Sequence, residues 1–194
     1  MRILVDCDGV LADFVGRFLE RVNARLGTMH RREDVTEYNI SRALGWTPEQ
    51  EHQAYSVVEP GFCTGLDVLP GAREGVEALQ RFGEIYVVTS PWLSCSTWEH
   101  ERRQWLERHF GIPALRVIST EAKYVVSGDV LIDDKVEHLD AWAHDQRCGW
   151  PLLWLTPHNA RALCRWPRVA TWDGLVELIQ ERAEGRWNKG RARR

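Results

Sequence analysis

Five short apolar runs constrain the fold of this chain more than any other feature, because they alternate with segments of helical spacing. They cover residues 2–5, 84–89, 115–118, 129–134 and 151–155. Their Val, Ile and Leu content is typical of strands buried on both faces of a sheet. Strands that alternate with helices favour a mostly parallel sheet with helices on both sides. The sequence therefore predicts a three-layer α/β fold.

Helical spacing and end signals place helices between these runs. Apolar residues recur at helical intervals over residues 14–26, and Gly27 follows the last of them. The same kind of pattern predicts helices over residues 70–82, 97–110 and 173–182. Each helix follows an apolar run or precedes one, as a parallel sheet requires.

Residues 28–69 have a different composition. They are mostly polar, are interrupted by Gly and Pro, and contain no run that resembles a strand. Two short helices are predicted, over residues 41–44 and 48–58. The second has Thr47 as its N-cap and Pro48 at its first position.

This change of composition predicts an inserted subdomain. We interpret residues 15–69 as a small helical cap, and residues 1–14 together with 70–194 as the main body. The last ten residues, 185–194, contain five basic residues and no acid, so we expect a solvated, flexible basic tail.

Charge and composition exclude several classes of function. The net charge is −3, which argues against a nucleic-acid-binding body; binding of nucleic acid through the basic tail is a disfavoured alternative. The sequence contains no run of about 18 apolar residues that could span a bilayer. The five cysteines show no CxxC spacing and no secretory signal is apparent, so a reducing cytoplasm is expected. Ten tryptophans are expected to pack the core or the contacts of a homodimer.

Polar side chains follow three of the predicted strands. Asp6 and Asp8 follow the first, Thr89 and Ser90 end the second, and a pair of acids ends the fourth. Ligands of parallel α/β sheets bind beyond the carboxyl ends of the strands. Alternation of side chains along the chain lets Asp6 and Asp8 converge, and Gly9 permits a sharp turn. Carboxylates so close together favour a hard cation such as Mg²⁺, so a metal-assisted site is predicted here.

In these motifs the chain resembles the haloacid dehalogenase (HAD) superfamily of phosphotransferases. The matching motifs are Asp6-Cys7-Asp8-Gly9, Thr89-Ser90, Lys123 and Asp133-Asp134, each in the order of that superfamily. In detail the chain is similar to the 5′(3′)-deoxyribonucleotidase family. That similarity includes Asp6 to Phe14, Leu69-Pro70-Gly71, Thr89-Ser90-Pro91, Leu131 to Lys135, and His158-Asn159. The resemblance implies a Rossmann-like HAD fold and a Mg²⁺-dependent phosphomonoesterase.

The resemblance also implies a role for each motif residue. Asp6 would attack phosphorus and form an aspartyl-phosphate, and Asp8 would protonate the leaving alcohol and then deprotonate water. Thr89 and Lys123 would contact the phosphoryl oxygens. Arg102, in the predicted helix over 97–110, is an alternative source of the phosphate-binding charge.

The implied cofactor is Mg²⁺, and the implied ligands come from three acids. Asp6, the backbone carbonyl of Asp8 and Asp134 would hold the ion, and Asp133 would orient this set from outside it. The cap would lie over the site and select the substrate.

The substrate implied by the resemblance is a nucleoside monophosphate, a deoxyribonucleoside monophosphate in particular. Phe14, Tyr38 and Ser90 are the candidate substrate-binding residues, and Phe62 is a further aromatic candidate. The cap departs from the family pattern at Tyr38-Asn39, so the preferred sugar and base stay open.

Two other functions remain to be separated from this one. A sugar phosphate or another small phosphomonoester would be hydrolysed by the same chemistry. A signalling receiver domain also uses a phosphorylated Asp with a Thr and a Lys, but the acids ending the fourth strand and the cap argue against it.

Overall fold

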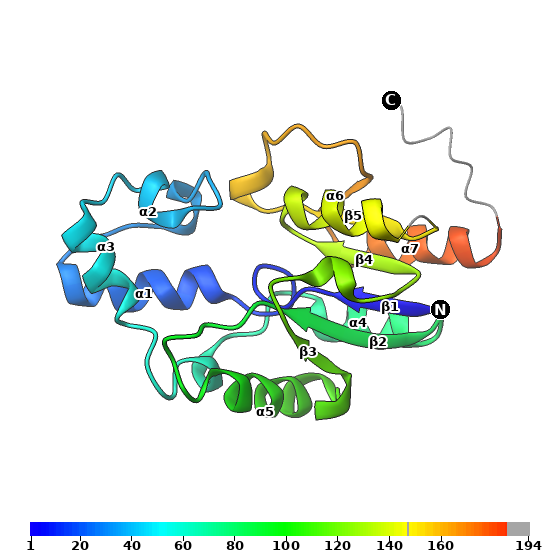
Figure 1. Ribbon diagram of the computed structural model, residues 1–194, viewed down its shortest axis with the longest axis horizontal. Coiled ribbons are helices and arrows are strands. Elements are labelled where there is room, and N and C mark those ends of the chain that lie inside the picture. The colour runs from blue at the N-terminus through cyan, green and yellow to red at the C-terminus, as the bar shows by residue number, and fades with distance from the viewer. Residues whose placement is uncertain (147, 186–194) are drawn as a thin grey trace.

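The structure, a computed structural model, describes residues 1–146 and 148–185, and within them six strands form one sheet (Figure 1). The strands lie in the order β3-β2-β1-β4-β5-β6, and every neighbouring pair is parallel. Their bounds are β1 Arg2–Val5, β2 Glu84–Thr89, β3 Val117–Ser119, β4 Val130–Asp133, β5 Trp150–Trp154 and β6 Arg168–Val169. The predicted α/β fold with a parallel sheet is confirmed.

The register of the central strands brings their polar ends together. Val5, the last residue of β1, pairs with Val87 of β2 and with Ile132 of β4. Asp6 therefore leaves the sheet level with the ends of both neighbouring strands. β1 lies between β2 and β4, so the strands that follow it in the chain are added first on one side of β1 and then on the other. The carboxyl end of β1 is therefore the topological switch point, where parallel sheets bind ligands.

Helices cover both faces of the sheet. Ile3 and Val5 point into the larger core, to which α4 (Ala72–Gln80), α5 (Trp98–Phe110) and α7 (Trp172–Ala183) contribute. Leu4 points to the opposite face, where it belongs to a smaller core with Leu139 and Trp142 of α6 (Val136–Asp145). The alternation of side chains along β1 thus creates the three layers expected from the sequence.

The segment between β1 and α4 is helical. It contains α1 (Phe14–Leu26), α2 (Ile40–Ala43) and α3 (Pro48–Tyr55), and Figure 1 shows these helices beyond the end to which the strands point. Asp13 caps α1 through a hydrogen bond from the Gly16 N–H (3.0 Å), and α1 ends at Gly27 in the left-handed conformation.

The caps and ends of the other short helices follow local rules in part. Thr47 and Gln50 form a capping box at the start of α3, and Pro48 occupies its first position, as predicted. This helix ends at Tyr55, earlier than the predicted residue 58. The predicted strand over 115–118 starts two residues later, because a 3₁₀ turn (Ala114–Arg116) precedes it.

Two chain segments connect this helical part to the sheet, and they lie side by side. The Leu69 N–H donates to the Leu11 carbonyl (2.9 Å), and the Asp13 N–H donates to the Asp67 carbonyl (2.9 Å). An insertion that leaves and returns through adjacent segments is what a cap subdomain over 15–69 requires. Its boundaries stay a prediction.

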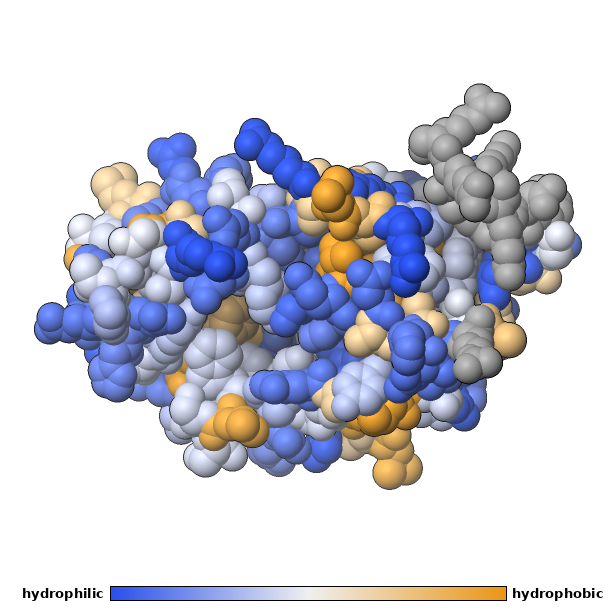
Figure 2. Space-filling view, turned by 45° about the horizontal axis from the view of Figure 1, so that its top comes forward, coloured by the Kyte–Doolittle hydropathy of each residue, from blue (hydrophilic) through white to orange (hydrophobic). Residues whose placement is uncertain are grey.

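The exposed apolar side chains of the described residues are scattered along the chain. Figure 2 shows a face on which hydrophilic residues predominate and apolar ones stand in separate patches. The most exposed aliphatic side chains come from distant segments: Met29, Leu93, Leu115, Val125 and Leu163. Among the described residues no helix is both long and apolar enough to cross a membrane, and the five cysteines are free. The homodimer and the cytoplasmic location stay predictions, and the tail beyond Gly185 lies outside the described residues.

Candidate active site

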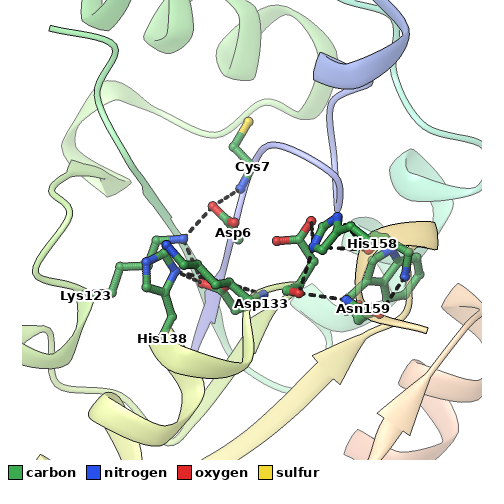
Figure 3. A network of polar contacts seen from close by, with 11 residues as sticks. Asp6, Cys7, Lys123, Asp133, His138, His158 and Asn159 are labelled. Carbon is green, nitrogen blue, oxygen red and sulfur yellow. Dashed lines mark hydrogen bonds and ion pairs between the residues drawn. The ribbon is translucent and has the colours of Figure 1, made fainter. Parts of the chain in front are cut away.

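Asp6 stands at the centre of a buried network at the carboxyl edge of the sheet (Figure 3). It directly follows β1, and its N–H donates to the Ile132 carbonyl of β4 (2.9 Å). Its Oδ1 accepts from the Cys7 N–H (2.7 Å) and lies 2.7 Å from Lys123 Nζ. Only 8% of Asp6 is exposed. The carboxylate predicted to be the nucleophile is therefore held in a fixed orientation.

Lys123 joins two acids of different strands. It begins a 3₁₀ turn (Lys123–Val125) and is buried, with Nζ 2.7 Å from both Asp6 Oδ1 and Asp133 Oδ2. Burial alone would lower the pKa of Lys123, but the two carboxylates raise it, so the amine stays charged. A positive charge is thus fixed beside the candidate nucleophile.

Both carboxylate oxygens of Asp133 contact neighbours within the protein. Besides Lys123, it accepts from the Lys135 N–H (2.8 Å), and His138 Nδ1 lies 3.2 Å from its Oδ2. Burial would raise the pKa of Asp133, but Lys123 and His138 lower it to about 2. These contacts suit a residue that orients the acidic cluster from outside.

Asp6, Asp133 and Asp134 bring carboxylate oxygens to within 4.8 Å of one another. Burial raises the pKa of Asp6 to about 6, with Lys123 opposing that rise and Asp133 adding to it. Burial and the charge of Asp6 raise the pKa of Asp134 well above its usual value. The raised pKa values of Asp6 and Asp134 mean that their negative charges are not fully balanced by neighbouring groups. A hard cation bound by their oxygens would balance these charges.

The turn after Asp8 approaches the same cluster closely. Gly9 has a φ of +79°, in the left-handed region, and a Cβ at this position would overlap Asp134 Oδ2. Only glycine therefore allows the loop to pass this close to Asp134. The side chain of Asp8 lies outside the cluster: both of its oxygens are 2.8 Å from Arg102 Nη2.

Thr89 and Ser90 reach this edge from β2. The Thr89 hydroxyl is buried and has no hydrogen-bond partner among the described residues. Ser90 lines a cavity of about 350 Å³ that also exposes Asp6, Asp8 and Asp134. Residues from three strand ends thus line one cavity, whereas Thr89, Lys123 and Asp133 are not among its lining residues.

Aromatic rings also line this cavity. Phe14, Tyr55, Trp92 and Trp98 line it, and the rings of Phe14 and Tyr55 lie 5.7 and 5.6 Å from that of Trp92. Phe62 is fully buried behind them and is not among the lining residues, so it does not contact the cavity.

Tyr38 extends from the cap to the core at the mouth of the cavity. Its ring lies 3.9 Å from Lys135 Nζ and 5.7 Å from the His158 ring, and 53% of Tyr38 is exposed. The predicted candidates Phe14, Tyr38 and Ser90 therefore all line the cavity.

Several lining residues were not singled out by the sequence. His138 lies in the first turn of α6, and His158 Nε2 lies 3.2 Å from the Asp134 carbonyl. Burial lowers the pKa of His158, which favours the neutral ring. The pair His158-Asn159 belongs to the family resemblance, which was the available signal; Asn159 Nδ2 donates to the same Asp134 carbonyl (2.7 Å). Nothing in the sequence marked His138 or Tyr55.

Comparison with protein families gives a match over nearly the whole chain. Residues 1–184 match the family described as 5′ nucleotidase, deoxy (pyrimidine), cytosolic type C protein. A mitochondrial 5′(3′)-deoxyribonucleotidase of Mus musculus is 34% identical over 176 residues, which cover 87% of this chain and 79% of that protein.

Solved structures show the same fold at low identity. A HAD family hydrolase of Deinococcus radiodurans with bound phosphate and sodium has a TM-score of 0.60 and 17% identity, covering 94% of this chain and 96% of that one. A HAD hydrolase of Bacillus subtilis bound to magnesium has a TM-score of 0.57 and 13% identity, covering 92% and 97%. The chain has the HAD fold, belongs to the 5′-nucleotidase family of cytosolic type C, and is a phosphomonoesterase of nucleotides.

Proposed function

We propose that this member of the 5′-nucleotidase family hydrolyses deoxyribonucleoside monophosphates to nucleoside and phosphate through an aspartyl-phosphate, with Mg²⁺ as cofactor. The observation that carries the proposal is a single cavity lined by two unlike groups of residues. Asp6, Asp8 and Asp134 form the group that we call the acidic end, and the rings of Phe14, Tyr55 and Trp92 form the group that we call the aromatic end. A nucleotide has the same division, with a phosphate at one end and a flat base at the other.

The first step uses the residues at the acidic end. A carboxylate oxygen of Asp6 attacks phosphorus, the bond to the leaving oxygen breaks, and Asp8 gives its proton to that oxygen. The charge of Lys123 beside Asp6 stabilises the phosphoryl oxygens, and the partnerless hydroxyl of Thr89 is a further donor.

The second step frees Asp6. Water attacks phosphorus of the aspartyl-phosphate, its proton passes to Asp8, and the bond between phosphorus and Asp6 breaks. Both steps place phosphate against the same groups, so one set of residues serves each of them.

The residues present fit Mg²⁺. Oxygens of Asp6 and Asp134 lie close together with raised pKa values, and Gly9 keeps the space beside Asp134 free of a side chain. The side chains of Asp6 and Asp134 and the backbone carbonyl of Asp8 would hold the ion, while Asp133 orients them. When bound, Mg²⁺ neutralises the charge between an anionic nucleophile and an anionic phosphate.

The aromatic end supports a nucleoside over a sugar. The cavity of about 350 Å³ lies in the size range of small-molecule sites. Stacking of a base on an aromatic side chain contributes about 1–3 kcal/mol. Phe14, Tyr38 and Trp92 supply such surfaces, and Ser90, which follows β2, also lines the cavity.

The test is a panel of phosphomonoesters with released phosphate as the readout. It contains the deoxy- and ribonucleoside 5′- and 3′-monophosphates, 2-deoxyribose 5-phosphate and glucose 6-phosphate, each with Mg²⁺ or with EDTA. We expect deoxyribonucleotides to be hydrolysed at least ~10-fold faster than the sugar phosphates, and no turnover in EDTA. Equal rates on sugar phosphates would overturn the substrate class, and full activity in EDTA would overturn the cofactor.

A further inference from the structure

Arg102 is the most deeply buried cation that the reaction outlined above does not use. It lies on α5 with only 1% of its surface exposed. Its Nη2 is 2.8 Å from both carboxylate oxygens of Asp8, and its Nη1 is 3.0 Å from Cys7 Sγ. The guanidinium lies over the Trp98 ring, 4.7 Å from its centroid. Burying a charged side chain is costly, so such a placement calls for a reason.

Arg102 does not reach the cavity. Asp8 lines that space, and Arg102 is absent from its lining. Lys123 is absent from the lining as well, so the two cations differ in the acid that they contact. Lys123 Nζ lies 2.7 Å from Asp6 Oδ1, whereas Arg102 contacts Asp8. The proposed reaction therefore gives the charge beside the nucleophile to Lys123 and leaves Arg102 with Asp8. Burial alone would lower the pKa of Arg102, but Asp8 raises it, so the guanidinium stays charged behind that carboxylate.

Neighbouring residues of the helix that carries Arg102 make further buried contacts. Glu101, the preceding residue, accepts from the Gly61 N–H (2.7 Å) and the Cys63 N–H (3.0 Å). One turn later, Trp105 Nε1 donates to the Leu66 carbonyl (2.8 Å). These contacts anchor α5 to the segment that returns from the cap. Arg102 thus has a rigid base from which to orient another side chain.

We propose that Arg102 is a positioning residue, which holds the carboxyl group of Asp8 at the cavity wall where the leaving oxygen of the substrate departs. The inference rests on the proposed function, because it assigns Arg102 to the proton transfer given there to Asp8. A single nitrogen that contacts both oxygens fixes the plane and direction of the carboxyl group. Each oxygen keeps a second lone pair, and one of these carries the proton that Asp8 gives to the leaving oxygen.

The consequence depends on the leaving group. A nucleoside alkoxide leaves only if Asp8 protonates it, whereas a 4-nitrophenolate leaves without a proton. The ratio kcat/KM reports the steps up to the first irreversible one, which is the departure of this group. Loss of the positioning contact should therefore lower kcat/KM for nucleotides and leave kcat/KM for 4-nitrophenyl phosphate nearly unchanged.

The experiment compares kcat/KM for a deoxyribonucleotide and for 4-nitrophenyl phosphate in the full-length chain. For Arg102→Gln we expect a loss of about 10²-fold on the nucleotide and of less than about 5-fold on the aryl ester. Arg102→Lys keeps a positive nitrogen near Asp8, and we expect it to recover at least about 5-fold of that loss. In an Asp8→Asn background, Arg102→Gln should cause no further loss on the nucleotide.

A matched control is Glu101→Gln, which changes the adjacent buried charge on α5 without touching Asp8. We expect it to lower the melting temperature and to leave the ratio of the two kcat/KM values as in the wild type. Equal losses on both substrates for Arg102→Gln, additive losses in the double variant, or the same ratio change in Glu101→Gln would overturn the inference. A wild-type chain that hydrolyses neither substrate would overturn the proposed function as well.

Discussion

The two ends of the cavity are built in opposite ways. At the acidic end, Lys123 Nζ lies 2.7 Å from both Asp6 Oδ1 and Asp133 Oδ2, and each residue comes from a strand end or the turn before a strand. At the aromatic end, the rings of Phe14 and Tyr55 lie 5.7 and 5.6 Å from the Trp92 ring, so the contacts there are between rings.

In the proposed function, the acidic end carries out the hydrolysis and the aromatic end selects the substrate. A change at the acidic end alters the charge balance of every group linked to it, and so affects both turnover and stability. A change at the aromatic end alters only the area and shape offered to the substrate. The same catalytic groups could therefore serve other phosphomonoesters if the aromatic wall were different.

The sharpest test of the acidic end is Asp6→Asn. We expect a loss of phosphate release of at least about 10⁴-fold, because the amide cannot form the aspartyl-phosphate. The melting temperature without Mg²⁺ should not fall, since burial and repulsion from Asp133 disfavour the carboxylate that is removed. Asp129→Asn is the control, because this acid lies at the opposite edge of the sheet and accepts from the Arg2 N–H. Activity of Asp6→Asn within tenfold of wild type would refute the nucleophile.

Lys123→Met tests whether the charged groups depend on one another. Removing the amine leaves two buried carboxylates without their partner, so the free energy of unfolding should fall by about 3–5 kcal/mol. Urea unfolding followed by circular dichroism measures this. Lys135→Met is the control on the partly exposed neighbour, and it should lose far less stability. A similar small loss in both variants would show that the buried contacts are not coupled.

Trp92→Ala tests the aromatic end alone. We expect kcat/KM for deoxyribonucleotides to fall by about 10- to 100-fold, from a lost stacking surface. The value for 2-deoxyribose 5-phosphate, which lacks the base, should stay within about 3-fold. Trp166→Ala, a tryptophan next to the smaller core away from the cavity, is the control. An equal loss on both substrates would mean that Trp92 supports the fold rather than the base.

The smallest expected effect is on the pH dependence of stability without Mg²⁺. The pKa of Asp6 is raised from 3.8 to about 6, so the folded chain binds more protons than the unfolded chain in this window. Unfolding free energy should therefore fall as pH rises, by about 1 kcal/mol between pH 5 and 7.5 from this carboxyl alone. The pKa of Asp133 is lowered to about 2, so its contribution to stability is lost only as pH falls below about 4. It therefore does not change the slope expected between pH 5 and 7.5.

Mg²⁺ should oppose this decline, because it binds the ionised carboxylates and competes with protons. Denaturant unfolding at the two pH values, with and without the ion, measures the effect. Asp6→Asn should lose most of the pH dependence. A chain whose stability rises from pH 5 to 7.5 without Mg²⁺ would contradict the raised pKa of the acidic cluster.

Much of the acidic end was predictable from local patterns. Short apolar runs predict strands, and parallel strands end at one edge, so Asp6, Thr89 and Asp134 could be brought together from the sequence. Asp13 as a cap and Gly27 as a helix end follow from rules that act over a few residues. Strand β6, by contrast, has two residues, too few for any periodic signal, and pairs with β5 only through the tertiary fold.

The sequence by itself therefore determined the fold class, the strand ends and the acids that they carry, because these depend on periodicities within single segments. Only the tertiary structure decided which neighbours those acids have. Lys123 contacts Asp6, and Arg102 contacts Asp8 across 94 residues, because packing, not spacing along the chain, sets these distances. The aromatic wall was decided in the same way, since its rings come from the cap, from α5 and from the loop after β2.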